Sequence, residues 1–175
     1  MKSTPNINKC KLFIALGNPS PEYTGTFHNA GFIALDFLFG SSEENLKEDK
    51  NFLYFKKGEI AFAKTSCFMN QSGAAVKNAL KFFKVKPEET AVLHDDSDIS
   101  LGAIKASFGR NSAGHKGVES VIKTLKNKNF WRLRVGIRRP AEKSKAGDFV
   151  LKKISRDDLL KIHSGLTSLK ESLNL

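Results

Sequence analysis

The sequence predicts a single-domain α/β fold, in which a twisted mixed β-sheet is covered by helices on both faces. A chain of 175 residues, 40% of them hydrophobic, is long enough for one core and short for two. Strand-like and helix-like segments alternate along it, which is typical of α/β sheets. There is no internal repeat or low-complexity linker. Residues 10–175 are therefore expected to form one domain after a flexible lead of residues 1–9.

The first third of the chain predicts a strand, a helix and a hairpin. Residues 10–16 are a short apolar run, as expected of a buried strand. After a polar loop, residues 30–40 carry apolar side chains at helical spacing, and Gly40 can end that helix. Residues 52–65 are two strand-like runs joined at Gly58, which predicts a hairpin.

The middle third continues the alternation. Residues 66–85 have apolar side chains at helical spacing, and Pro87 is expected to stop this helix after Val85. Residues 90–98 predict a strand of four or five residues that runs into an acidic loop. Residues 101–117 predict another strand and then a Gly-rich turn.

The last third predicts two helices and one strand. Residues 118–125 place apolar side chains on one helix face. Residues 129–140 alternate in the strand period, so that Arg132 and Arg134 share a face and are expected to line one edge of the sheet. Ser155 is a possible N-cap of the final helix. The side chains expected to face the core from that helix are Leu159, Leu160, Ile162, Leu166 and Leu169.

Charge is the clearest departure from an average composition. The chain has 29 Lys and Arg against 18 Asp and Glu, a net charge of +11. Such domains commonly bind nucleic acid, because neutralised phosphates release their counterions. A lysine-rich solvated surface without a partner is the alternative, and composition leaves both open.

The cysteine and hydropathy patterns indicate a cytoplasmic protein. Cys10 and Cys67 have no metal-binding or disulfide spacing, as expected in a reducing compartment. There is no apolar run of about 18 residues, and the N-terminal residues lack the apolar core of a signal peptide. We therefore expect a protein with no membrane contact.

Four polar clusters each follow a predicted strand. They span residues 18–29, 68–73, 94–98 and 109–117. Ligand sites in α/β sheets gather beyond the carboxyl ends of the strands. We therefore expect these four clusters to share one crevice.

The residues of that crevice suit hydrolysis. His28 is the candidate base, because imidazole titrates near neutrality, and Asp95 could fix its tautomer. No Ser or Cys nucleophile accompanies this pair, so water would be the nucleophile. Asn18 and Asn70 can donate to a substrate carbonyl and to the oxyanion it becomes. Each residue alone is also an ordinary turn or cap residue, but the set together favours a site.

Two other kinds of site are compatible with these residues, a metal site and a phosphate site. His94, Asp95, Asp96 and Asp98 could bind Mg²⁺, although such carboxylates also form solvated turns. Residues 109–117 do not match a P-loop. Their glycines and helix start would still suit a phosphate.

Five motifs resemble the bacterial-type peptidyl-tRNA hydrolase family in order and spacing. They lie between about residues 11 and 152 and read LGNPSPEYTGTFHNAGF, TSCFMNQSG, LHDDSD, GHKG and NFWRLRVGI. The resemblance implies an enzyme that cleaves the ester between a peptide and the 3′-terminal ribose of tRNA. It implies no cofactor and no metal. The expected partners are peptidyl-tRNA and the tRNA acceptor stem, and the expected state is a monomer.

The resemblance also implies residue roles. His28 would act as the base on water and Asp95 would orient it. The expected substrate-binding residues are Asn18, Tyr23, Phe68, Asn70 and Lys116. The expected tRNA-binding residues are Lys105, Arg110 and Arg134.

Three departures from the family pattern stand out. Lys116 replaces an asparagine and cannot accept a hydrogen bond. Phe27 replaces an arginine before the catalytic histidine. Ser107 replaces a lysine that contacts the tRNA 5′-phosphate, while Arg134 matches the other half of that clamp. These departures leave an alternative open, a catalytically weak or inactive RNA-binding protein on the same scaffold.

Overall fold

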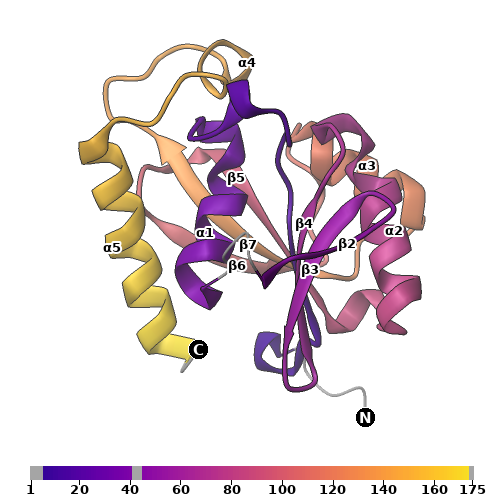
Figure 1. Ribbon diagram of the computed structural model, residues 1–175. Helices are drawn as coiled ribbons and strands as arrows, with labels where there is room; N and C mark the ends of the chain where they lie inside the picture. Colours follow the sequence, from indigo (N-terminus) through magenta and orange to yellow (C-terminus); the bar gives the residue numbers. More distant parts are fainter. Residues whose placement is uncertain (1–5, 41–44, 174–175) are drawn as a thin grey trace.

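A computed structural model describes residues 6–40 and 45–173 (Figure 1). The strands are β1 (Leu12–Ala15), β2 (Lys47–Asp49), β3 (Phe52–Lys57), β4 (Ile60–Thr65), β5 (Thr90–Ser100), β6 (Ile104–Phe108) and β7 (Trp131–Arg138). The α-helices are α1 (Ala30–Phe39), α2 (Ser72–Phe83), α3 (Lys116–Leu125), α4 (Ala146–Phe149) and α5 (Arg156–Leu173). Short 3₁₀ turns span Ile7–Lys9, Pro21–Tyr23, Phe27–Asn29, Met69–Gln71 and Pro87–Glu89.

The strands form one mixed sheet in the order β2-β3-β4-β1-β5-β7-β6. The inner strands β4, β1, β5 and β7 are parallel, whereas β2, β3 and β6 pair antiparallel at the two sides. The predicted fold class is therefore confirmed. No helix in the described part of the chain is long and apolar enough to cross a membrane.

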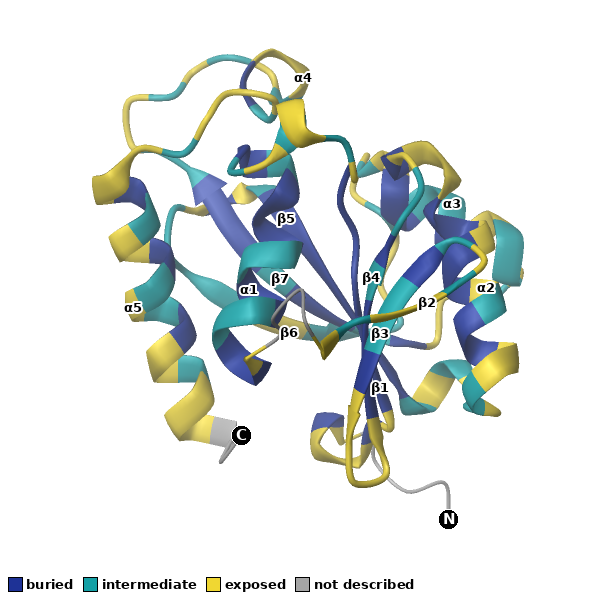
Figure 2. Ribbon diagram, in the orientation of Figure 1, coloured by how far each residue is buried: buried dark blue, intermediate teal, exposed yellow. Residues whose placement is uncertain are grey.

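Successive side chains of the central strand β1 point to opposite faces of the sheet, so the hydrophobic core has two layers. Phe13 and Ala15 of β1 face α1 and α5, whereas Leu12 and Ile14 face α2 and α3. Figure 1 shows the two helix pairs on opposite sides of the sheet, and Figure 2 shows that the buried residues concentrate along the inner strands. Helices cover both faces, as the sequence predicts.

Left-handed residues end the first two α-helices. Gly40 has φ 66° and caps α1, as predicted. Helix α2 ends at Phe83, earlier than the predicted Val85. Lys84 adopts φ 55° there, and its N–H donates to the carbonyls of the last turn. The left-handed conformation of Lys84 therefore ends the helix, and Pro87 does not.

Strand β5 is longer than predicted. It runs from Thr90 to Ser100, so His94 to Asp98 belong to a strand and not to an acidic loop. The neighbouring strand β7 pairs with it without interruption as far as Asp96 and, after a register shift, again at Ser100. The Arg134 Nε also donates to Asp96 Oδ2 at 2.8 Å. Pairing and a charged partner therefore override the weak strand propensity of aspartate.

Two further predictions on the last third are wrong. Strand β7 lies between β5 and β6, so its arginines do not line an edge of the sheet, and Arg132 is buried. In α5, Leu160 is 58% exposed, because Ile162 and Leu166 occupy the face toward the core. The predicted N-cap is present, since Ser155 Oγ accepts from the Asp158 N–H at 3.2 Å.

The predicted N-terminal lead is only partly described. Residues 1–5 lie outside the described residues. Ile7–Lys9 forms a 3₁₀ turn that Asn6 caps, and Ile7 is buried against the α1 side of the sheet. This part of the lead therefore packs with the domain.

Gly31 lets the first turn of α1 approach the end of β1 and the middle of β5. A Cβ at this position would lie 2.6 Å from the carbonyl oxygen of Leu93 and 2.8 Å from that of Leu16. We expect Gly31→Ala to lower the free energy of unfolding by about 1–3 kcal/mol, measured in urea. Gly147→Ala is the control, since a Cβ there meets nothing within 4 Å. Equal stability of the two variants would contradict this close packing.

Candidate active site

A cleft of about 820 Å³ contains residues from all four predicted polar clusters. It lies beyond the carboxyl ends of the parallel strands, where ligand sites of α/β sheets are expected. The predicted crevice is therefore present. A fifth segment, residues 145–151 around α4, also lines the cleft and was not predicted from the sequence.

Asp95 lies at the centre of a hydrogen-bonded group in this cleft. Its Oδ1 is 2.9 Å from His28 Nδ1 and 2.8 Å from His115 Nε2. The side chain of Asp95 is 3% exposed, and that of His28 is 14% exposed. Water in the cleft can thus reach the imidazole of His28, while the carboxylate is shielded.

His115 is the site residue that sequence reasoning missed. It is the N-cap of α3, where its Nδ1 accepts from the Val118 N–H at 3.2 Å. Because this nitrogen is an acceptor, the proton lies on Nε2, which donates to Asp95. The available signal was a polar residue three positions before the predicted helix, close to the usual place of a capping side chain.

His28 has the opposite tautomer. An ionised carboxylate only accepts hydrogen bonds, so Nδ1 of His28 carries a proton toward Asp95 and leaves the lone pair on Nε2. The backbone of His28 is also fixed, because its N–H donates to the Val150 carbonyl at 2.7 Å. The neighbouring Phe27 N–H donates to Lys152 at 3.1 Å. The segment after α4 therefore holds the loop that carries the imidazole.

The histidines keep the central carboxylate ionised. Burial acts to raise the pKa of Asp95, but the adjacent His115 and His28 more than offset it. The net effect holds the pKa of Asp95 well below its usual range. Asp95 can therefore accept from both rings at neutral pH.

Ligand atoms of His28, Asp95 and His115 lie within 4.8 Å of one another, a set that could hold a metal ion. To bind an ion, His115 Nε2 would have to lose the proton that the capping bond of Nδ1 places there. Asp96, a member of the Mg²⁺ alternative, is already bonded to Arg134. We therefore expect no resident metal.

His94 is buried beside this group. Its Nδ1 lies 2.6 Å from the Asp95 carbonyl oxygen, and its ring packs edge-on against His115 with centroids 4.7 Å apart. Burial, with a further contribution from His115, holds the pKa of His94 well below its ordinary value. The folded protein therefore keeps His94 neutral.

This neutral histidine should make stability sensitive to acid. The unfolded chain protonates His94 near the ordinary pKa of 6.5, whereas the folded chain resists protonation. Its contribution is thus complete above pH 6.5 and is lost as the pH falls below it. We expect the free energy of unfolding to fall by up to about 1.4 kcal/mol per pH unit from this group. His94→Phe should flatten the slope between pH 6.5 and 4.5, and an unchanged slope would contradict the assignment.

Asn18 is positioned by bonds that leave its amide nitrogen for the cleft. Its Oδ1 accepts from the Met69 N–H at 2.8 Å, and its backbone N–H donates to Asn29 Oδ1 at 2.8 Å. No hydrogen bond within the described ranges occupies its Nδ2. Asn70 is exposed at the cleft and is likewise available to a ligand.

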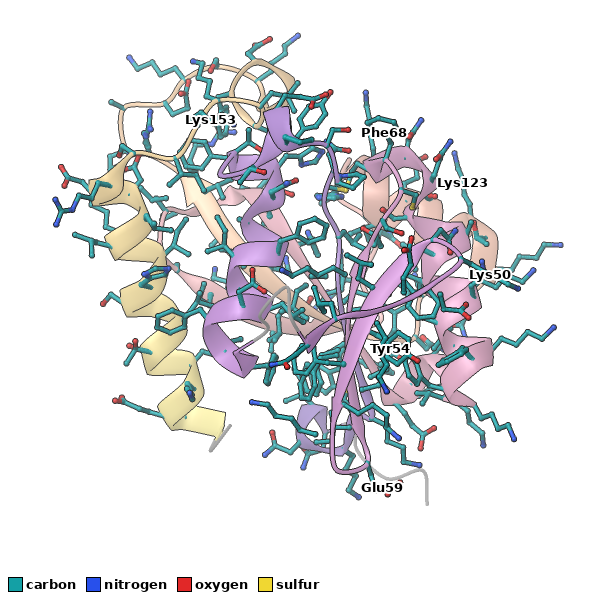
Figure 3. All side chains as sticks on the ribbon, in the orientation of Figure 1. Lys50, Tyr54, Glu59, Phe68, Lys123 and Lys153 are labelled. Carbon is teal, nitrogen blue, oxygen red and sulfur yellow. The ribbon has the colours of Figure 1, made fainter. Side chains whose placement is uncertain are left out.

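The remaining predicted substrate-binding residues also line the cleft. Tyr23 and Phe68 meet edge to face with ring centroids 6.4 Å apart, and Phe68 is 48% exposed. Figure 3 labels Phe68 near the surface above α3. Lys116 is exposed at the first position of α3. The rings of Tyr23 and Phe68 can contact an apolar part of a substrate, and the ammonium group of Lys116 can contact an anionic part.

The predicted tRNA-binding residues lie outside the cleft. Lys105 and Arg134 face each other on β6 and β7, and Arg110 follows β6. Lys105 and Arg110 are exposed, whereas Arg134 is half-buried against Asp96. The structure thus brings the predicted catalytic and substrate-binding residues together and leaves the predicted tRNA-binding residues on the adjoining strands.

Comparisons with known proteins agree on one family. The family model described as peptidyl-tRNA hydrolase matches residues 12–175. A peptidyl-tRNA hydrolase of Mycoplasma capricolum is 38% identical over 169 residues, covering 94% of this chain and 91% of that protein. One from Neisseria meningitidis is 38% identical over 156 residues, covering 86% and 81%. The crystal structure of peptidyl-tRNA hydrolase from Acinetobacter baumannii superposes with a TM-score of 0.82 at 27% identity, covering 97% and 89%.

Proposed function

The chain belongs to the peptidyl-tRNA hydrolase family, and we propose that its cleft carries out the family reaction with a water molecule activated by His28. The chain is accordingly an ester hydrolase that separates the peptide from tRNA and returns the tRNA to translation. The observation that supports the mechanism best is the bond from His28 Nδ1 to Asp95 Oδ1, 2.9 Å long. This bond leaves Nε2 as a proton acceptor in the cleft.

The reaction begins when His28 Nε2 takes a proton from water. Asp95 stabilises the imidazolium that forms, and the hydroxide attacks the ester carbonyl. The amide N–H groups of Asn18 and Asn70 donate to the oxygen as it becomes an oxyanion. When the intermediate collapses, the imidazolium returns the proton to the departing ribose oxygen. The products are tRNA with its hydroxyl restored and a peptide carboxylic acid, which releases its remaining proton to solvent.

The cleft binds the peptide part of the substrate, and the adjoining strands β6 and β7 bind its RNA part. Tyr23 and Phe68 offer aromatic surface to the peptide. Lys105, Arg110 and Arg134 bind phosphates of the acceptor stem, with Arg134 sharing its charge between Asp96 and the RNA. The enzyme acts as a monomer in the cytoplasm, where translation takes place.

Lys116 supplies a positive charge where the family motif has an asparagine. It is exposed at the cleft and begins α3. We expect Lys116→Asn to leave kcat unchanged or to raise it, because the carboxamide restores a group that both donates and accepts. Steady-state hydrolysis of N-acetyl-aminoacyl-tRNA measures the effect. A large loss would show that the lysine has a catalytic role of its own.

The function is tested by release of the peptide. Purified protein should liberate N-acetyl-amino acid from N-acetyl-aminoacyl-tRNA under multiple turnover. Tight tRNA binding without release would favour the alternative of an inactive RNA-binding protein. None of the relatives described above supports that alternative, since each is named as a hydrolase.

A further inference from the structure

The positive charge of the chain is concentrated in two segments. Residues 66–86 contain four lysines and no acidic residue, and residues 109–129 contain five basic residues and one acidic residue. These 42 residues therefore carry a net charge of +8 of the total +11. If the lysines only kept the surface solvated, we would expect positive charge to be distributed along the whole chain. In this chain it is concentrated in two segments.

The two segments contain α2 and α3, which pack side by side on one face of the sheet. The Gly73 N–H donates to Ser120 Oγ at 3.0 Å, and a Cβ at Gly73 would collide with Ser120 and Thr124. The inner sides of both helices are buried in the core, through residues such as Val76 and Val121. Their outer sides therefore form one continuous surface.

Lysines dominate this outer surface, which we call the α2–α3 face. On α2 and its cap, Lys77, Lys81 and Lys84 are all exposed. Figure 3 shows Lys123 extending from α3 away from the sheet. Glu119, the one acidic residue of the two segments, is bonded to Lys123 at 2.9 Å. The lysines of α2 and its cap have no ion pair within the described ranges.

The α2–α3 face also adjoins the cleft. Lys116 lines the cleft and starts α3, so the basic surface begins beside the reacting ester. From there it extends over α3 to α2. A long polyanion whose end lies in the cleft would be held along this surface by its phosphates.

We propose that the α2–α3 face binds the sugar-phosphate backbone of the tRNA body beyond the nucleotides that enter the cleft. The inference rests on the proposed function, because it takes peptidyl-tRNA as the substrate. The contacts are made by exposed lysines to phosphates, so they are independent of sequence and weaken with salt. They raise the affinity for complete tRNA and leave the chemistry of the ester unchanged.

The test compares two substrates that share one ester. One is N-acetyl-aminoacyl-tRNA, and the other is the trinucleotide CCA with the same N-acetyl-aminoacyl group. We expect the triple variant Lys77→Glu, Lys81→Glu, Lys84→Glu to lower kcat/KM on tRNA by about tenfold or more. The slope of log(kcat/KM) against log salt should fall by about 1 for each lost phosphate contact. On the trinucleotide, kcat/KM should stay within about twofold of the unmodified chain, since Lys77, Lys81 and Lys84 lie beyond the first turn of α2 and do not line the cleft.

A control variant changes the net charge equally on other surfaces. Lys9, Lys161 and Lys170 are exposed and lie outside both basic segments, so their replacement by glutamate should affect tRNA far less. If the glutamate triple variant is unstable to heat, the corresponding Lys→Gln triple variant keeps the test valid. Equal losses for the α2 and control variants, or an equal loss on both substrates, would overturn the proposal. Failure of the unmodified chain on both substrates would instead overturn the proposed function.

Discussion

His28→Ala is expected to lower kcat for hydrolysis of N-acetyl-aminoacyl-tRNA by about 10²–10⁴-fold. The variant keeps Asp95 and the amide donors but loses the imidazole nitrogen that takes a proton from water. Since the lysines and arginines are unchanged, the Kd for tRNA should stay within about twofold. Single-turnover release of the N-acetyl-amino acid, together with a binding titration, measures both quantities.

The matched control is a histidine outside the cleft. His163 on α5 stacks on Phe37 with ring centroids 4.6 Å apart and has no contact with the reacting group. His163→Ala should therefore retain kcat. A His28→Ala variant with nearly full activity would remove the base from the mechanism, and equal losses in the two variants would indicate a structural effect.

Asp95→Asn is the substitution with the second largest expected effect. Asparagine has nearly the same shape, but it carries no charge to stabilise the His28 imidazolium, and its amide can donate toward a ring nitrogen. His28 can then adopt the opposite tautomer, with its proton on the cleft side. We expect kcat to fall by about 10²–10⁴-fold, the upper end being the loss that a triad Asp→Asn change gives in a serine protease. Hydrolysis assays across pH 6 to 9 measure the loss.

His115 provides the comparison for this variant. His115 bonds to the same carboxylate oxygen as His28, so Asp95→Asn disturbs both rings, whereas His115→Gln removes only one donor. The Asp95 variant should be the slower of the two. If Asp95→Asn keeps kcat within about threefold of the unmodified chain, the carboxylate does not orient the base.

Most of the fold could be predicted because its signals are local. Helices α1, α2 and α3 follow from apolar spacing, and the hairpin follows from the turn at Gly58. The length of β5 could not be predicted, since its aspartates are held in a strand by pairing with β7 and by Arg134. The exposure of Leu160 depends in the same way on which side of α5 packs on the sheet.

The residues of the candidate site could be predicted from the sequence where the residue type itself indicates the chemistry. His28 and Asp95 are 67 positions apart. His28 follows β1, and Asp95 lies just past the part of β5 that pairs with β1, so both lie where ligand sites of parallel sheets are expected. The family resemblance inferred from the motifs is confirmed by the family model and by the relatives. His115 escaped prediction because its role combines a helix cap and a bond to a distant carboxylate. The hydrogen bond from the His28 N–H to the Val150 carbonyl could not be predicted either, because it joins the backbones of two irregular segments.

The tautomers of His28 and His115 in the candidate site test the central claim most directly. The ¹⁵N chemical shifts of His28 and His115 distinguish a protonated ring nitrogen from one that bears a lone pair. The bonds around Asp95 predict a proton on Nδ1 of His28 and on Nε2 of His115 at pH 8. A proton on Nε2 of His28 would contradict the account, because that nitrogen could not then take a proton from water.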